Sequence, residues 1–213
     1  MKRKKTKIRA LIFDIGGVLQ LGEERTKGVH KYVSRKFRIS LDQYLDAIDT
    51  TYAKSIEGKL SEERVIEILA KNLKTTKKRL VRLYKKAYKK NFKLNKELLK
   101  FVKKAKKQGI ATAIISDMWH LSKRSLVLKK FYRIFKPVIL SCDIKIRKPN
   151  PEIYRLTLEK LKIQPEEAVF IDNREWNIKP AKKLGIKTIL FKNNKQTIKE
   201  LNKIVKWENQ IKK

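Results

Sequence analysis

The sequence predicts an α/β protein in which a doubly wound parallel sheet carries an all-helical cap domain inserted after its first strand. Two observations support this fold class. Short, continuously apolar runs rich in β-forming residues alternate with helical segments in the second half of the chain, as in parallel sheets covered by helices on both faces. A long segment behind the first apolar run shows helical periodicity only.

The first strand and the insertion follow from local patterns. Residues 8–13 form an apolar run that ends at Asp14 and a Gly16-Gly17 pair, which indicates a buried strand entering a tight turn. Between residues 23 and 95 we expect helices and no strand, because apolar residues recur there with the spacing of one helix face. Two such faces are Leu41, Tyr44, Leu45 and Ile48, and Val65, Ile66, Leu69 and Leu73.

Strands and helices alternate after the insertion. We expect a helix over residues 98–107, closed by Gly109, and further helices over 153–161 and 178–184. Four more strands are predicted, at residues 110–115, 138–140, 168–171 and 188–191. The predicted division is therefore a core of residues 1–22 and 96–213 and a cap of residues 23–95.

Length and composition exclude several classes of protein. The 213 residues correspond to one domain or one domain with an insertion. No apolar run reaches the ~20 residues that a membrane-spanning helix needs, so no membrane partner is expected, and the basic N-terminus lacks the features of a signal peptide. Cys142 is the single cysteine, so we expect no internal disulfide and a reducing, cytoplasmic location. Nothing in the sequence predicts an oligomeric state.

The charge of the chain is strongly positive. Lys and Arg number 56 against 21 Asp and Glu, a formal net charge of +35, and residues 71–107 contain 17 basic residues and one acid. Such a field attracts polyanions but says nothing about fold. Most of the basic residues are lysine, so a nucleic-acid or other polyanion partner and a compositional origin both stay open. The segment 71–107 by itself is expected to be a solvated helix face.

Polar side chains stand where the predicted strands end. Asp14, Ser116 and Asp172 follow the first, second and fourth strands, and Lys148 lies in the loop after the third. Ligands of open α/β sheets bind beyond these carboxyl ends, so the four side chains are expected to converge. Two carboxylates and a free backbone carbonyl suit Mg²⁺. With the lysine and the hydroxyl they can hold a phosphate group, whose phosphorus Asp14 can attack to form an acyl phosphate.

Four segments in register resemble the signature motifs of the haloacid dehalogenase-like (HAD) hydrolase superfamily, in its Asp-x-Gly-Gly-Val subgroup with a helical cap after the first strand. Residues 11–19 (LIFDIGGVL) are similar to the nucleophile motif and residues 115–117 (ISD) to the second motif. Residues 147–154 (RKPNPEIY) resemble the lysine-bearing third motif, and residues 169–173 (VFIDN) the acidic fourth. The resemblance covers almost the whole chain and reaches residues 57–63 (EGKLSEE) of the cap.

The resemblance implies a Rossmann-like core and a Mg²⁺-dependent phosphomonoester hydrolase that uses an aspartyl-phosphate intermediate. It implies Asp14 as the nucleophile, with Ser116 and Lys148 as phosphate-binding groups and Lys148 also catalytic. Asp14, Asp172 and the backbone carbonyl of Gly16 would ligate the Mg²⁺. The cap would close over the site, and its basic part would attract a small anionic substrate such as a nucleotide or sugar phosphate.

Two positions depart from the family pattern. The family's phosphatases usually carry a second Asp two residues after the nucleophile as general acid and base, and here that position is Gly16. Because such proton transfer is worth about 10²–10⁴-fold, a low activity is expected. Asn173 stands where this subgroup often has an acid. Its oxygen can still hold a metal-bound water, but with one charge fewer it should weaken Mg²⁺ binding.

Two alternative functions stay open. A haloacid dehalogenase would use Asp14 to displace halide from carbon without a metal, and that chemistry also lacks the second Asp. The hydrophilic, basic cap speaks against it, since a haloalkanoate needs an apolar pocket. The other alternative is a catalytically weakened HAD fold that binds RNA or another polyanion, although stacking aromatics are not interleaved through the basic segment.

Four further residues near the motifs are expected to be structural. Asp117 can cap the helix that follows the second motif or point into the site, and the cap is favoured. Trp119 is predicted to be an exposed aromatic side chain and His120 a loop histidine with its hydrogen bonds satisfied. Cys142 is expected to be a small buried hydrophobic residue.

Overall fold

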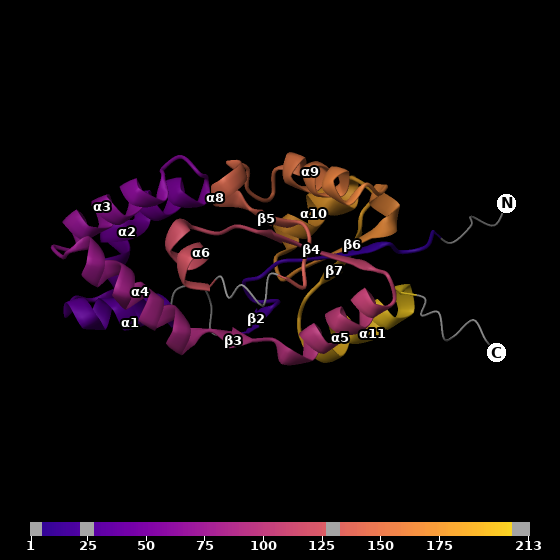
Figure 1. The fold of residues 1–213 in the computed structure, drawn as a ribbon, viewed down its shortest axis with the longest axis horizontal. Coiled ribbons are helices and arrows are strands. Elements are labelled where there is room, and N and C mark those ends of the chain that lie inside the picture. Colours follow the sequence, from indigo (N-terminus) through magenta and orange to yellow (C-terminus); the bar gives the residue numbers. More distant parts are fainter. Residues whose placement is uncertain (1–5, 22–27, 127–132, 206–213) are drawn as a thin grey trace.

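The computed structural model describes residues 6–21, 28–126 and 133–205. At its centre lies a parallel sheet of five strands (Figure 1). Across the sheet the strands follow the order β5 (Val138–Leu140), β4 (Ala111–Ser116), β1 (Ala10–Phe13), β6 (Ala168–Asp172) and β7 (Lys187–Leu190). The five predicted strands are confirmed, each within two residues of its expected bounds, and so is the α/β fold class.

The central strand β1 serves two hydrophobic cores. All four of its residues are buried, and because successive side chains point to opposite faces of a strand, they divide between the cores. Leu11 and Phe13 belong to one apolar cluster and Ile12 to the other. A strand buried on both faces has no polar positions, which is why β1 is a continuous apolar run.

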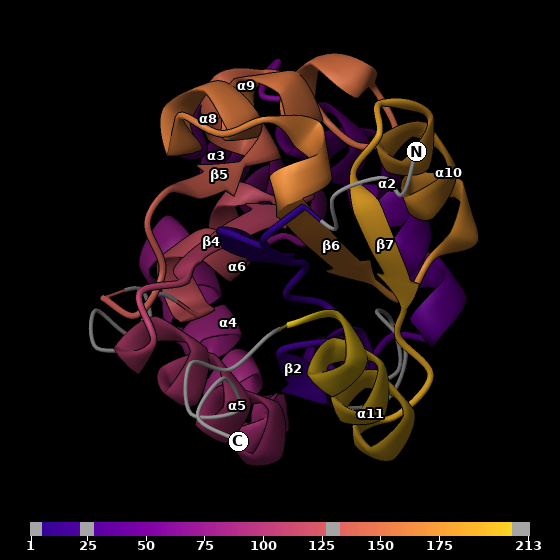
Figure 2. The ribbon, with the colours of Figure 1, turned by 90° about the vertical axis from the view of Figure 1, so that its right-hand side faces the viewer.

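Helices cover both faces of the sheet, as Figure 2 shows. On one side lie α5 (Lys96–Lys107) and α11 (Asn194–Ile204), and on the other α9 (Pro151–Leu161) and α10 (Glu175–Lys183). A short helix, α8 (Ser141–Ile144), follows β5, and a 3₁₀ turn, η1 (Pro165–Glu167), precedes β6. The sheet edge at which the strands end faces the remaining helices (Figure 1).

Four helices form a separate layer beyond that edge. They are α1 (Val29–Phe37), α2 (Leu41–Ile56), α3 (Glu62–Asn72) and α4 (Lys77–Asn91). Three of them begin at an N-cap side chain that accepts a backbone hydrogen bond, from Ser40, Ser61 and Thr76. Helix α6 (His120–Leu126), which follows β4, packs against α3 and α4. The division of the chain at residues 23 and 95 stays a prediction, since α6 joins this layer from outside those bounds.

One prediction about the insertion was wrong. Strand β3 (Lys93–Leu94) lies within residues 23–95 and pairs antiparallel with β2 (Gln20–Leu21). Two residues leave no periodic pattern, and the partner strand lies far away in the sequence, so local reasoning had nothing to detect. The β2–β3 pair joins the segment that follows the β1 loop to the segment that precedes α5. Next to this pair, the backbone N–H of Asn95 donates to the carbonyl of Leu19 at 2.9 Å.

The basic segment is solvated as predicted. All 17 of the Lys and Arg residues in 71–107 are exposed, at the end of α3, on α4, β3 and α5, and in the turns between them. Cys142 is buried, also as predicted. In the part of the chain that the structure describes, no helix has the length and apolar character to cross a membrane.

Candidate active site

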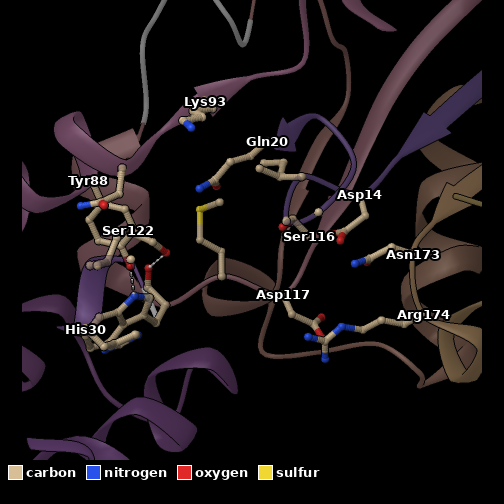
Figure 3. Close-up of a pocket in the computed structure, with 18 of the residues that line it drawn as sticks. Asp14, Gln20, His30, Tyr88, Lys93, Ser116, Asp117, Ser122, Asn173 and Arg174 are labelled. Carbon is tan, nitrogen blue, oxygen red and sulfur yellow. Dashed lines mark hydrogen bonds between the residues drawn. The ribbon is translucent and has the colours of Figure 1, made fainter. Parts of the chain in front are cut away.

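Three of the predicted site residues leave the sheet at its carboxyl edge. The register pairs Phe13 of β1 with Ile171 of β6, so Asp14 and Asp172 emerge from neighbouring strands at the same level. The backbone N–H of Asp14 donates to the carbonyl of Ile171 at 2.9 Å and fixes that level. Ser116 ends β4 on the other side of β1, and Figure 3 shows it beside Asp14.

The ammonium group of Lys148 joins the two carboxylates. Its Nζ lies 2.8 Å from Asp14 Oδ1 and 2.7 Å from Asp172 Oδ2, and the side chain is only 1% exposed. Burial acts to lower the pKa of Lys148, yet the charges of Asp14 and Asp172 outweigh it and raise that pKa above its ordinary value. Lys148 is therefore a buried cation that offsets the repulsion between two acids.

Asp172 is held firmly in this cluster. It is fully buried, and its Oδ1 accepts a hydrogen bond of 2.8 Å from the backbone N–H of Arg174. Its Oδ2 accepts from the Nδ2 of Asn177 at 3.0 Å as well as from Lys148. Three donors from two loops and one helix thus fix the orientation of this carboxylate.

Asp14 lies in a different environment. Burial raises its pKa from the ordinary 3.8 to about 6, while the charge of Lys148 works against that rise and the charge of Asp172 adds to it. At neutral pH the carboxylate form still prevails. Among the described residues, none donates a hydrogen bond to Asp14 Oδ2. One oxygen of Asp14 is thus held by Lys148, and the other is available for reaction.

The two glycines of the loop after β1, Gly16 and Gly17, differ in backbone conformation and in the space around them. Gly17 has a φ of +83°, which favours glycine, and a Cβ at this position would lie 2.3 Å from Asn173 Nδ2, so the Asn173 side chain would have to move. At Gly16 an added Cβ would meet no atom within 4 Å, and φ is not positive. The space around Gly16 is therefore open, at the position where the phosphatases that the chain resembles usually carry a second Asp.

A cavity of about 930 Å³ opens on this edge of the sheet. The predicted site residues in its wall are Asp14, Gly16, Ser116 and Asn173. Ser116 Oγ makes no hydrogen bond with any described residue, so it is available to a ligand. Lys148 and Asp172 are not part of the wall and lie buried behind Asp14. The structure thus brings all the predicted residues together but exposes only some of them to the cavity.

The opposite wall comes from the helical layer and combines aromatic side chains with polar and basic ones (Figure 3). Its rings are His30, Tyr52, Tyr88 and Trp119. Trp119 was predicted to be exposed, which is wrong: it is 2% exposed, and its Nε1 donates to Tyr88 Oη at 2.7 Å. Its ring partners lie on α1, α2 and α4, and no local pattern in the sequence predicts contacts with helices so distant along the chain. The ring of His120 has a hydrogen-bond partner as predicted, since Nδ1 lies 2.8 Å from Ser55 Oγ, but the residue begins helix α6 and does not lie in a loop.

Sequence reasoning did not single out His30. Its ring is buried, and Nδ1 lies 3.0 Å from Tyr44 Oη. Burial lowers the pKa of His30 from 6.5 to about 4, so the imidazole is neutral at physiological pH. The aromatic rings of this wall therefore carry no charge, and its positive charge comes from Lys90 and Lys93. A His spaced among helical apolar positions gives no signal that it will line a cavity.

Asp117 was predicted to cap the following helix, and the structure corrects this. Its Oδ1 accepts a hydrogen bond of 3.0 Å from the backbone N–H of Lys148, and its Oδ2 lies 3.9 Å from Arg147 Nε. The side chain, which lines the cavity, is 4% exposed. Asp117 therefore anchors the loop that delivers Lys148 to the two carboxylates.

The oxygen donors at this edge fit Mg²⁺ in their chemistry. They are the carboxylates of Asp14 and Asp172, the carbonyl of Gly16 and the amide of Asn173. The described residues contain no cluster of three or more His, Cys, Asp or Glu side chains that could cage a metal. Mg²⁺ does not need one, because it is usually held by one or two carboxylates and a substrate phosphate and keeps several waters.

The fold and this carboxylate–lysine cluster define an α/β protein with a buried charged cluster beside a cavity at the carboxyl edge of its sheet. The chain belongs to the haloacid dehalogenase-like hydrolase family, whose family model matches residues 11–191. Among solved structures it is similar to a HAD family enzyme of Bacteroides thetaiotaomicron in complex with magnesium and inorganic phosphate. The TM-score is 0.69 at 21% identity, over 85% of this chain and 93% of that one; at this identity the likeness shows the fold alone.

Curated relatives share a shorter segment. Identity is 35% over 104 residues with bifunctional epoxide hydrolase 2 of Rattus norvegicus, which covers 46% of this chain and 19% of that protein. It is 32% over 98 residues with glyceraldehyde 3-phosphate phosphatase of Pyrococcus furiosus, 45% and 41% of the two chains. It is 29% over 89 residues with (S)-2-haloacid dehalogenase 4A of Burkholderia cepacia, 41% and 38%. The matches thus span less than half of each relative.

Proposed function

We propose that the protein is a Mg²⁺-dependent phosphomonoester hydrolase that works through an aspartyl-phosphate on Asp14. The observation that carries the proposal is the arrangement of Asp14, with one oxygen held 2.8 Å from Lys148 Nζ and the other available at a cavity. The similarity to a phosphatase of Pyrococcus furiosus, and in fold to an enzyme holding magnesium and phosphate, supports this reading.

The reaction takes two displacements at phosphorus. Asp14 Oδ2 attacks the phosphorus, the bond to the ester oxygen breaks, and the leaving oxygen takes a proton from water in the cavity, because Gly16 supplies no acid. A second water then attacks the phosphorus of the aspartyl-phosphate, breaks its bond to Asp14 Oδ2 and gives its proton to the hydroxide that the first step left. Inorganic phosphate leaves, and the Asp14 carboxylate is restored. The sum is one monoester and one water giving one alcohol and one phosphate.

The chain's own groups prepare Asp14 for this step. Lys148 compensates the negative charge of Asp14, which lowers the repulsion that a dianionic phosphate meets on approach. Ser116 Oγ donates to a phosphate oxygen. Asp14, Asp172 and Gly16 would hold Mg²⁺, with Asn173 at a bound water, and the ion supplies charge neutralisation of the phosphate oxygens.

The substrate is a small phosphorylated anion. Lys90 and Lys93 are exposed and line the cavity, so they present positive charge to an approaching anion. A second candidate function, binding of RNA or another polyanion, is favoured by the 17 exposed basic residues of 71–107. Such binding loses affinity steeply as salt rises, and retention on nucleic acid at physiological salt is its test.

The first experiment is hydrolysis of 4-nitrophenyl phosphate with and without Mg²⁺. Turnover that needs Mg²⁺ and disappears in Asp14→Asn supports the proposal. Asp49→Asn makes the same chemical change at an exposed position of α2 and serves as the matched control. Absence of phosphate release together with metal-independent halide release from a 2-haloacid would instead favour the dehalogenase alternative.

A further inference from the structure

Trp176 is the large hydrophobic side chain that stands exposed in the described part of the chain, with 56% of its surface accessible. It lies in the first turn of α10 and lines the same cavity as Asp14 and Asn173. A single exposed apolar side chain on an open surface needs no explanation. One placed in the wall of a catalytic cavity, next to its phosphate end, is positioned to touch the substrate.

The indole of Trp176 is held in place by its neighbour. The guanidinium carbon of Arg174 lies 5.0 Å from the centroid of the Trp176 ring, a cation–π contact that covers one face. The backbone N–H of Arg174 is in turn bonded to Asp172 Oδ1 at 2.8 Å. The stacked pair is therefore anchored to the carboxylate cluster and keeps a fixed relation to Asp14. We call Arg174 and Trp176 the platform.

The rest of the wall limits the chemistry of the leaving group. Within the described lining, acidic side chains occur only at the strand ends, as Asp14 and Asp117. A cationic leaving group would therefore find no counter-charge away from the phosphate.

Some polar side chains of the helical wall already donate hydrogen bonds to backbone carbonyls of the protein. Ser122 Oγ donates to the carbonyl of Trp119 at 2.9 Å, and Asn91 Nδ2 donates to that of Ala87 at 2.7 Å. These two donors are therefore not available to a substrate, whereas Trp176 presents an exposed indole to a planar ring.

We propose that the leaving group carries a heteroaromatic ring, as in a nucleoside monophosphate, and that this ring stacks on Trp176 while the phosphate lies at Asp14. The inference rests on the proposed function and adds the substrate class. Stacking of a base on an aromatic side chain tolerates every base because each has a π-face. The platform thus selects for a nucleoside as a class and not for one base.

The test compares adenosine 5′-monophosphate with ribose 5-phosphate, because both release a primary alcohol at the same carbon and only one carries a base. We expect kcat/KM to be at least about tenfold higher for the nucleotide, mainly through KM. Trp176→Leu brings the ratio close to one, and Trp176→Phe keeps part of the preference. Lys179→Ala, an exposed change on α10 outside the cavity wall, leaves the ratio at its wild-type value. A ratio near one in the wild type, or one that Trp176→Leu does not change, overturns the inference.

A binding measurement separates this inference from the proposed function. Calorimetric titration of Asp14→Asn, which lacks the nucleophile, gives the Kd of each compound without turnover. The inference expects tighter binding of adenosine 5′-monophosphate and a loss of about tenfold in the Asp14→Asn, Trp176→Leu double variant. If no phosphate ester is hydrolysed, the proposed function fails, and this titration alone decides on the platform: equal binding of the two compounds overturns it.

Discussion

Asp117 Oδ1 accepts a hydrogen bond of 3.0 Å from the backbone N–H of Lys148, 31 residues further along the chain. The bond joins the end of β4 to the loop that carries the buried cation. Lys148 Nζ then reaches Asp14 and Asp172 at 2.8 and 2.7 Å. A residue that does not hold the cation itself thus sets where the cation lies.

Replacing Asp117 tests this positioning role. Asp117→Ala leaves the N–H of Lys148 without its partner in a part-buried place, and we expect a loss of about 1–3 kcal/mol in the free energy of unfolding together with a fall in kcat. Asp117→Asn keeps an acceptor oxygen and should restore most of both. Urea unfolding and steady-state kinetics measure the two effects. If Asn were as damaging as Ala, the charge of Asp117 and not its hydrogen bond would be what matters.

Removal of the buried cation should be severe. In Lys148→Met the carboxylates of Asp14 and Asp172 lose the group that compensates them, and breaking a buried ion pair in this way costs about 3–5 kcal/mol. Adding Asp14→Asn removes one of the two buried carboxylate charges that lack a partner in this variant and should recover part of the loss. The free energies of unfolding of both single variants and the double variant, at one pH, give the coupling. Strictly additive values would contradict the shared cluster.

The raised pKa of Asp14 predicts a pH-dependent stability. Above about pH 6 the native protein holds Asp14 as a buried carboxylate, and the shift from 3.8 to about 6 makes that state less stable. Asp14→Asn removes the charge and should stabilise the metal-free protein by on the order of 1–3 kcal/mol at pH 8.

This advantage should shrink as pH falls from about 6 toward 4. In that range the native wild type takes up a proton while Asp14 of the unfolded chain stays ionised, so the wild type recovers its stability. Thermal or urea unfolding of both proteins between pH 4.5 and 8 in EDTA measures the difference. A difference that is constant over this range would mean that Asp14 has an ordinary pKa.

Gly16 offers a gain-of-function test. A side chain at position 16 meets no atom within 4 Å of its Cβ, and the backbone there does not require glycine. Gly16→Asp would supply the missing general acid and base, and such a group is worth about 10²–10⁴-fold. For a substrate with a poor leaving group, we expect kcat of Gly16→Asp to rise by a factor approaching that range. Gly16→Ala is the control, and its kcat should not rise. An unchanged kcat in Gly16→Asp would show that proton transfer does not limit turnover.

Salt tests the role of the basic residues at the cavity. Lys90 and Lys93 line it, whereas Lys78 and Lys85 are exposed on α4 outside it. If the first pair attracts the substrate, Lys90→Gln with Lys93→Gln should raise KM and flatten its increase with NaCl. Lys78→Gln with Lys85→Gln removes the same net charge and should change KM and its dependence on NaCl far less. Equal effects of the two pairs would assign the attraction to net charge alone.

Much of the fold could be predicted because the strands of this sheet are buried on both faces. Burial on both sides makes β1 and β6 uninterrupted apolar runs, which are visible without any knowledge of their partners. Asp14, Ser116 and Asp172 could be placed together for the same reason, since the ends of parallel strands share one edge.

The remaining features depend on partners that are distant in sequence. The pairing of β2 with β3, the burial of Trp119 against Tyr88 and the bond from Lys148 to Asp117 each join segments that no local pattern links. The exposure of Trp176 in the cavity wall is of the same kind.

The sequence alone therefore determined the sheet, the polar residues at its edge and the family that they resemble. Only the tertiary structure decided which of those residues reach the cavity, which stay behind it and what faces them, because these properties arise from contacts that form when distant helices and loops pack together.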